Sequence, residues 1–171
     1  MERKTEHSHV ITIRPLCMED YKFVSRWSED EEFCKANGWE SNKNERELYE
    51  WWLRCVNDDV EDFIRMGIEM EERMIGYVDL ADIKNNSAEI GIAIGERSLW
   101  GRGIGTKSIL LLLEYAVKNF GITTFYAETH EANIRSRRML EKMGFKEMSR
   151  NGKEVYYGSD NQLLQYMLKI Q

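Results

Sequence analysis

A glycine-rich segment in the second half of the chain limits the choice of folds most. It reads Trp100-Gly101-Arg102-Gly103-Ile104-Gly105-Thr106, and it joins an alternating apolar stretch, 88–94, to a long amphipathic stretch, 104–119. The first pattern predicts a strand and the second predicts a helix. Glycines let the backbone bend tightly, and the first turn of a helix leaves N–H groups without intrahelical partners. This order therefore predicts an anion site, for a phosphate or pyrophosphate.

Two common phosphate motifs do not fit this segment. A dinucleotide fingerprint that starts at Gly101 needs glycine where the chain has Thr106, and a P-loop needs glycine directly before Lys107. A glycine-rich turn that binds no ligand is also compatible with the pattern. The nature of the ligand must therefore come from other parts of the sequence.

The remaining segments predict a mixed α/β or α+β layer structure. Strands are predicted over 10–13, 62–70, 74–81, 123–129, 145–149 and 163–170, helices over 19–27, 45–55 and 133–142, and loops over 29–41 and 151–161. The chain has 171 residues and contains no repeat or linker, which predicts one domain over residues 1–171 with a flexible N-terminus at 1–9.

Charge and cysteine content narrow the class of protein. The net charge of −6 disfavours nucleic acid as a partner and suits a cationic acceptor. Three separated cysteines, Cys17, Cys34 and Cys55, predict reduced thiols in the cytoplasm and no metal site. The longest apolar run, 109–113, is too short to span a membrane. We expect a cytoplasmic protein with no membrane partner, and either a monomer or a homodimer.

Two blocks of the sequence resemble the GCN5-related N-acetyltransferase (GNAT) family. The family's phosphate loop, Gln/Arg-x-x-Gly-x-Gly/Ala, matches residues 100–105, with Trp100 in place of Gln or Arg. A second block, Asn-x-x-Ser/Ala followed by Glu-Lys-x-Gly-Phe, matches 133–136 and 141–145. The resemblance covers about residues 11–170 and is nearest to the RimJ/RimL-like ribosomal-protein N-acetyltransferases and small-amine acetyltransferases. It implies a mixed, mostly antiparallel sheet of six to seven strands, splayed at the centre, with about four helices.

The resemblance implies acetyl-coenzyme A (acetyl-CoA) as cofactor, and it implies roles for matching residues. The pyrophosphate is expected at the backbone amides of Gly101, Arg102, Gly103, Ile104, Gly105 and Thr106. The thioester carbonyl is expected at the backbone N–H groups of Ile92, Ala93 and Ile94, and the pantetheine or thiol end at Asn133 and Ser136. The Arg102 side chain either adds a charge-assisted contact or is solvated. Asn133 is also a good helix N-cap, and Ser136 is also compatible with simple packing.

Proton transfer has several candidate residues. A lysine-like amine is mostly protonated at pH 7, so a base must remove a proton before attack. Glu89 holds the position that the family implies for this base, and Asp79 and Asp82 are alternatives that would otherwise bind a cationic acceptor. Leu140 stands where many members have a tyrosine acid, which leaves Ser136 or water for that role. His130, near the end of a strand, is either structural or a participant.

The resemblance therefore implies an N-acetyltransferase that acts by direct attack in a ternary complex. The acceptor is expected to be a primary amine of a protein N-terminus or of a small molecule, such as a polyamine or aminoglycoside. Trp39, Trp51 and Trp52 either stack on a cationic acceptor or belong to the core. A non-catalytic acetyl-CoA sensor and an enzyme of nucleotide phosphates are the alternatives.

Overall fold

A mixed sheet forms the centre of the computed structural model, which describes residues 9–41 and 43–171. The strand order is β1 (Ile11–Pro15), β2 (Ile64–Met70), β3 (Arg73–Lys84), β4 (Ser87–Ile94), β5 (Thr124–His130), β8 (Ser159–Lys169) and β6 (Lys146–Ser149), and β7 (Lys153–Tyr156) pairs with β8. Only β4 and β5 are parallel among these pairs. The predicted fold class is confirmed, with one strand and one helix more than expected. Of the N-terminal residues 1–9 that were predicted to be flexible, residues 1–8 lie outside the described residues.

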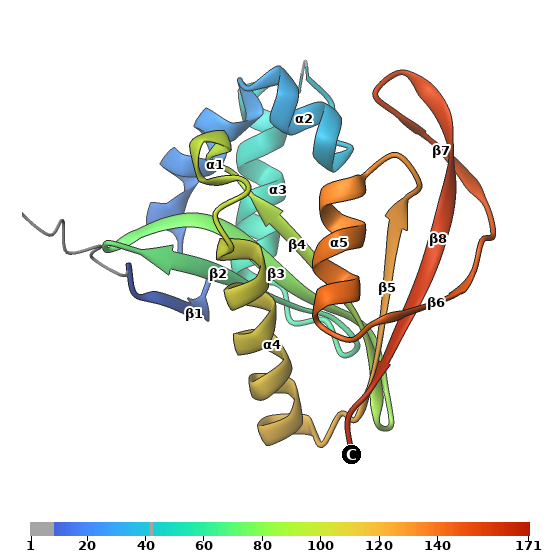
Figure 1. Cartoon of the computed structure of the whole chain (residues 1–171). Coiled ribbons are helices and arrows are strands. Elements are labelled where there is room, and N and C mark those ends of the chain that lie inside the picture. The colour runs from blue at the N-terminus through green and yellow to red at the C-terminus, as the bar shows by residue number, and fades with distance from the viewer. Residues whose placement is uncertain (1–8, 42) are drawn as a thin grey trace, which may run out of the picture.

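The sheet opens between β4 and β5, as the resemblance implies. The two strands pair from Ser87 with Thr124 to Glu89 with Tyr126, and no pairing follows beyond that point. Because both strands continue, to Ile94 and to His130, their carboxyl halves diverge. The splay leaves a gap at the centre of the sheet, between 90–94 and 127–130 (Figure 1).

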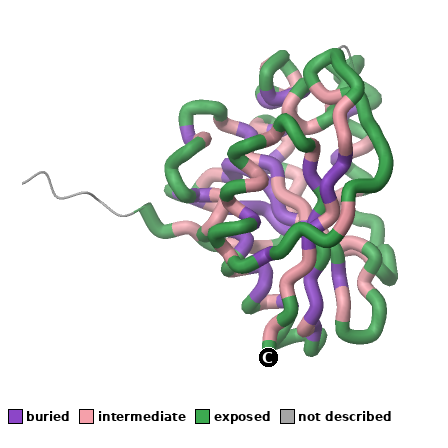
Figure 2. Tube along the Cα trace, turned by 45° about the vertical axis from the view of Figure 1, so that its right-hand side comes forward, coloured by how far each residue is buried: buried purple, intermediate pink, exposed green. Residues whose placement is uncertain are grey.

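Helices cover both faces of the sheet. The elements α4 (Ile104–Phe120) and α5 (Ile134–Lys142) pack on one face, and α1 (Tyr21–Ser28), α2 (Glu31–Asn37) and α3 (Glu45–Asn57) pack on the other. Two short 3₁₀ helices, Met18–Asp20 and Arg97–Leu99, precede α1 and α4. Alternate residues of β3 serve the two cores, because Tyr77 packs with α1–α3 and Val78 packs with α4. Figure 2 shows the buried positions inside these layers and the exposed ones along the outer turns.

Two predicted loops contain secondary structure. The segment 29–41 contains α2, because the Asp30 carboxylate accepts hydrogen bonds from the N–H groups of Glu32 (3.0 Å) and Phe33 (3.3 Å), and Gly38 ends the helix at φ +67°. The segment 151–161 contains β7, which turns into β8 through Tyr157-Gly158, both at positive φ. Both elements are short and polar, so they lack a hydrophobic period. They matter for function because they flank the central gap.

One buried ion pair makes folding stability depend on pH. Asp20 is 3% exposed and accepts hydrogen bonds from both terminal nitrogens of Arg14, at 2.8 Å each. Burial raises the pKa of Asp20, but the hydrogen bonds from Arg14 and from the Cys17 N–H outweigh it and hold the pKa below its ordinary value. The ionised carboxylate therefore stabilises the fold above the unfolded-state pKa of about 3.9, and this contribution is lost as the pH falls through the folded-state value.

We expect Asp20→Asn to lower the free energy of unfolding at pH 7 by about 2 kcal/mol. Urea unfolding measured between pH 7 and pH 2 should show a smaller acid-dependent loss in this variant than in the wild type. The exposed Asp160→Asn, as the matched control, should follow the wild-type curve. Parallel curves for Asp20→Asn and wild type would show that another carboxylate governs the acid transition.

Candidate active site

The glycine-rich segment forms an open turn at the start of α4. Gly101 and Gly103 adopt φ +74° and +78°, a conformation that favours glycine. A Cβ atom added at either position would meet nothing within 4 Å, so the space in front of the turn is free. Gly103 is the N-cap of this 17-residue helix, whose first turn has no acidic residue and no side-chain cap among the described residues. The N–H groups of residues 104–106 and the helix dipole therefore fit an anion such as a pyrophosphate.

Trp100 and Arg135 form one wall of this turn. The Trp100 Nε1–H donates a 2.8 Å hydrogen bond to the Ile94 carbonyl, which ties the turn to the end of β4. The Arg135 guanidinium lies 4.3 Å from the centroid of the Trp100 ring and adds positive charge at the same place. Sequence reasoning missed Arg135, although it lies inside the matched block 133–136.

A first pocket of about 190 Å³ lies between the glycine turn, β4 and α5. Its lining includes Ile92, Ile94, Gly101, Gly103, Gly105, Thr106, Asn133 and Ser136, all predicted from the sequence, together with Trp100, Arg135 and Met139. The exposed Arg102 side chain is not part of this lining, and the Ile104 side chain packs into the core. The buried Ile104 side chain leaves that residue a role only through its backbone amide, and the charge-assisted contact of the exposed Arg102 side chain stays a prediction.

The edge of β4 directs two amides into the gap. The Gly95 N–H donates to the Ile75 carbonyl (2.8 Å), which makes the neighbouring pair of Ile94 and Gly76 a non-hydrogen-bonded pair of the ladder. By the alternation of a strand, the N–H groups of Ile94 and Ile92 point away from β3, toward the gap. Ala93 does not share this position: its N–H faces β3, and its side chain is buried among α1–α3. Of the three predicted amides, the structure brings two to the gap.

A second pocket of about 290 Å³ adjoins the first across the gap. Both pockets share Ala36, Asn37, Ile92, Asn133, Ser136 and Met139. The second pocket also takes in the end of α2, residues 35–38, the end of β5, residues 127–130, and part of β7, residues 154–156. The two pockets therefore make one passage through the splayed sheet, with the glycine turn at one end and β7 at the other, and the end of α2 borders both pockets.

Asn133 and Ser136 lie at the junction of the two pockets. The Asn133 Oδ1 atom accepts a 3.2 Å hydrogen bond from the Ser136 N–H, so Asn133 is the N-cap of α5. Its pocket position leaves its side-chain amide in reach of a ligand as well. Leu140, one turn further on, is 3% exposed and contributes an apolar surface to the second pocket. That position therefore supplies no acid.

The predicted carboxylates fall at different distances from the gap. Glu89 is exposed, lies in the paired part of β4 and lines neither pocket. Partial burial of its carboxylate, with Glu128 and Asp82 nearby, raises the pKa of Glu89. Asp79 is held by Arg65 through hydrogen bonds of 2.7 and 2.8 Å, and Asp82 pairs with Lys84 at 2.7 Å. Both alternatives to Glu89 as the base, Asp79 and Asp82, thus form ion pairs with neighbouring cations. Asp79 is a structural residue.

Four polar residues of the second pocket have side chains that could contact the acceptor, and the sequence analysis did not assign this contact to them: Glu128, His130, Glu154 and Tyr156. The Glu128 carboxylate accepts a 2.8 Å hydrogen bond from the Gln165 side chain. The sequence indicates that His130 is either structural or a participant. The missed signal for Glu128 was the alternation of β5, which places it on the same face as His130.

The three tryptophans predicted to contact a cation divide into two groups. Trp52 is 0% exposed and donates to the Cys17 carbonyl, so it is a core residue. Trp39 and Trp51 line a separate pocket of about 250 Å³, where the Lys43 ammonium already lies 5.5 Å from the centroid of the Trp51 ring. Within the described residues there is no cluster of His, Cys, Asp and Glu that fits a metal ion. No helix in that part of the chain has the length and apolar character to cross a bilayer.

Comparisons with known proteins agree with this geometry. The model of the acetyltransferase (GNAT) domain matches residues 11–146. An uncharacterized protein of Methanocaldococcus jannaschii is 32% identical over 149 residues, covering 80% of this chain and 30% of that protein. The human alpha/beta-tubulin-N-acetyltransferase 9 is 27% identical over 153 residues, covering 86% of this chain and 64% of that protein. The chain thus spans less than two thirds of either relative.

A solved structure supports the same fold. The spermidine N-acetyltransferase of Vibrio cholerae, in complex with CoA and spermine, superposes with a TM-score of 0.80 at 21% identity and covers 93% of this chain and 95% of its own. The family model covers most of the chain, including the glycine turn and the second block at α5. This chain therefore belongs to the GNAT acetyltransferase family.

Proposed function

We propose that this chain transfers the acetyl group of acetyl-CoA to a primary amine, with the two substrates entering the passage from opposite ends. The observation that carries the proposal is the continuity of the two pockets through the splayed sheet, with the glycine turn and the helix start of α4 at one end. The site fits the cofactor, because Gly101 and Gly103 leave open space in front of free helical amides. When bound, acetyl-CoA supplies a thioester whose carbonyl carbon accepts the amine nitrogen.

Different residues bind or stabilise different parts of the cofactor along the passage. The amides of 104–106 and the Arg135 guanidinium hold the diphosphate end, and Asn133 and Ser136 orient the arm at the junction. The N–H groups of Ile92 and Ile94 stabilise the negative charge that develops on the carbonyl oxygen, an interaction worth about 3 kcal/mol in comparable acyl transfers. Because Ser136 lines both pockets, we assign to its hydroxyl the return of a proton to the departing thiolate.

The acceptor end of the passage suits a cationic amine. Glu128 and Glu154 contribute carboxylates to the second pocket, and the chain as a whole carries a net charge of −6. A protein N-terminal amine, a polyamine and an aminoglycoside all have this character. One of the similar proteins is named as a tubulin acetyltransferase and another as a spermidine acetyltransferase. The proposal therefore includes both protein and small-molecule acceptors. We further propose a cytoplasmic monomer or homodimer.

An acceptor screen tests the proposed function. Purified protein is mixed with acetyl-CoA and with polyamines, aminoglycosides or N-terminal peptides, and thiol release and acetylated product are measured together. We expect stoichiometric release and product with at least one amine class. Tight binding of acetyl-CoA in calorimetry with no turnover of any amine would instead support a sensor. Absence of acetyl-CoA binding would overturn the proposal.

A further inference from the structure

We propose that His130, held by Glu154 and Tyr156 of the β7–β8 hairpin, is the general base that removes the proton from the attacking amine. This inference rests on the proposed function and adds the base, for which the sequence favoured Glu89. The carrying observation is a juxtaposition: an imidazole at the end of β5, in the second pocket, level with the thioester amides of β4.

The register of the splayed strands places His130 at the reaction level. Ser87 pairs with Thr124 and Glu89 with Tyr126, and continuing this parallel register puts His130 opposite Ala93. Ala93 lies between Ile92 and Ile94, whose N–H groups face the gap. In this extended register, His130 is the β5 residue at the same strand level as the predicted position of the carbonyl oxygen.

Two carboxylates on the same face lie further from this level. Glu89 precedes Ala93 by four residues along β4, which corresponds to about 13 Å at the rise of a strand. Glu128 precedes His130 by two residues along β5, or about 7 Å. In addition, the Glu128 carboxylate is engaged by the Gln165 side chain at 2.8 Å. The geometry thus favours the imidazole over either acid.

The hairpin fixes the orientation of the imidazole. The His130 Nε2 atom lies 3.1 Å from the Glu154 carboxylate, and its ring stacks on the Tyr156 ring with centroids 4.4 Å apart and planes 13° apart. When Nε2–H donates to Glu154, Nδ1 is the nitrogen that accepts a proton. An imidazole oriented by a carboxylate is the arrangement that general-base catalysis uses.

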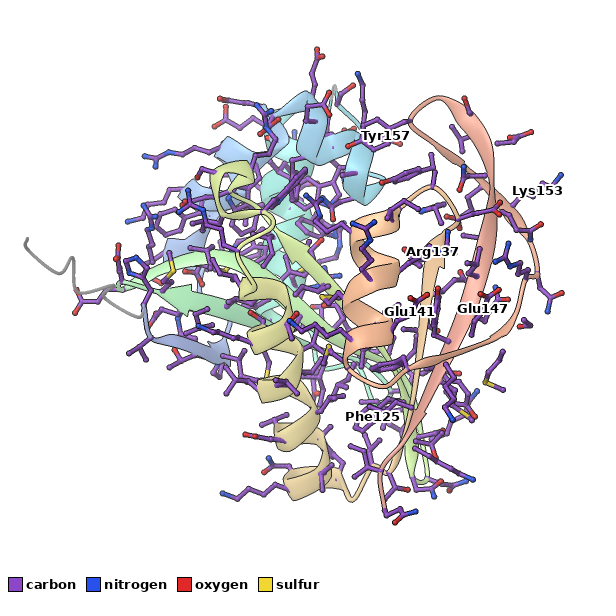
Figure 3. All side chains as sticks on the ribbon, in the orientation of Figure 1. Phe125, Arg137, Glu141, Glu147, Lys153 and Tyr157 are labelled. Atoms are coloured by element: carbon purple, nitrogen blue, oxygen red, sulfur yellow. The ribbon has the colours of Figure 1, made fainter. Side chains whose placement is uncertain are left out.

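The tip of the hairpin lies on the side of the pocket where α2 ends. Tyr157, at its tip, reaches toward α2 (Figure 3). Burial raises the pKa of Tyr157, and the neighbouring Tyr156 and the Glu32 carboxylate of α2 raise it further. The α2 helix and the hairpin together frame the pocket in which His130 lies. The sequence predicted neither α2 nor β7. In this proposal the two elements share one function, which is to frame the pocket.

The proton balance is complete with this assignment. The ammonium form of the acceptor first loses one proton to solvent, and the neutral nitrogen attacks the carbonyl carbon. As the C–N bond forms, the nitrogen gives its surplus proton to His130. The C–S bond breaks with its electron pair on sulfur, and the thiolate takes a proton from the imidazolium, directly or through Ser136. The products are the amide and the free thiol, and the imidazole is neutral again.

Three variants distinguish the candidate bases once an acceptor is known. We expect His130→Gln to lower kcat about 100-fold or more, with the KM for acetyl-CoA unchanged. Glu89→Gln should retain kcat within about threefold, because Glu89 lines neither pocket and does not lie level with the thioester amides. Added imidazole should restore part of the activity of His130→Ala. Full activity of His130→Gln, or a large loss confined to Glu89→Gln, would overturn the inference and leave the proposed function intact.

A pair of variants tests whether Glu154 orients His130 or only stabilises the hairpin. We expect Glu154→Gln to lower kcat about tenfold without changing acetyl-CoA affinity or melting temperature. Asp160→Asn, on the same hairpin and exposed, is the matched control and should match the wild type. Equal kcat for Glu154→Gln and Asp160→Asn would show that the carboxylate does not orient His130.

A labelling experiment gives a readout that does not depend on turnover. Diethyl pyrocarbonate acylates neutral imidazoles, and mass spectrometry quantifies the reaction at His130 and at the distant, exposed His9. Saturating acetyl-CoA should slow labelling of His130 at least threefold and leave His9 unchanged. Calorimetry that shows acetyl-CoA binding without such protection would place His130 outside the reaction site. Absence of binding in the same experiment would instead overturn the proposed function.

Discussion

Replacing Gly103 with glutamate is expected to abolish acetyl-CoA binding while the protein stays folded. Gly103 adopts φ +78°, where a residue with a Cβ atom costs about 1–2 kcal/mol. Its missing side chain points into open space in front of the helix start, where the proposed diphosphate lies. A glutamate there occupies that space and opposes the anion with its own charge. Calorimetry should show at least a 100-fold rise in Kd for acetyl-CoA.

Gly121 provides a matched control at the other end of α4. It adopts φ +63°, and a Cβ atom there also meets nothing within 4 Å. Gly121→Glu introduces the same strain and the same charge, far from the proposed cofactor. We expect its melting temperature to fall at least as much as that of Gly103→Glu, because a carboxylate at the C-terminal end of a helix also opposes the helix dipole. Its Kd should remain that of the wild type. Unchanged affinity in a folded Gly103→Glu would refute the assignment of the glycine turn.

The sequence predicted best what depends on local geometry. The glycine turn, the long helix after it and the cap at Asn133 each follow from a few adjacent residues whose backbone needs are specific. The gap was implied by the family resemblance, and its position follows from where β4 and β5 stop pairing. For these features, local chemistry and tertiary structure point to the same arrangement.

The sequence failed where position depends on distant partners. The hairpin of β7 and β8 folds back so that Glu154 meets His130, 24 positions earlier in the chain, and no local pattern encodes that contact. Arg135 acquires its role from Trp100 across the turn, and Asp79 loses the role of a base because Arg65 of the neighbouring strand binds it. Ala93 was grouped with its neighbours although strand alternation turns its amide the other way. That last error was avoidable from the pleat alone.

Removing the carboxylate of Asp79 is expected to be among the most destabilising single changes in the chain. The side chains of Arg65 and Asp79 are 16% and 15% exposed and form two hydrogen bonds, of 2.7 and 2.8 Å. The guanidinium is also enclosed by aromatic rings, with its central carbon 4.4 Å from the centroid of Tyr77. Burial lowers the pKa of Arg65, but its hydrogen bonds to Asp79 and the charge of that carboxylate raise it above its ordinary value. Arg65 therefore stays charged.

Asp79→Ala consequently leaves a buried, charged guanidinium without its counter-ion. The expected loss in unfolding free energy is about 3–5 kcal/mol, measured by urea denaturation. Glu50→Ala, which breaks the exposed pair with Arg46, is the matched control and should cost less than about 0.5 kcal/mol. Adding Arg65→Met to Asp79→Ala should recover most of the loss, since the unpaired charge is then gone. A loss that persists in this double variant would mean that the cost arises from lost packing, and a loss below about 1 kcal/mol in the single variant would mean that water reaches the guanidinium.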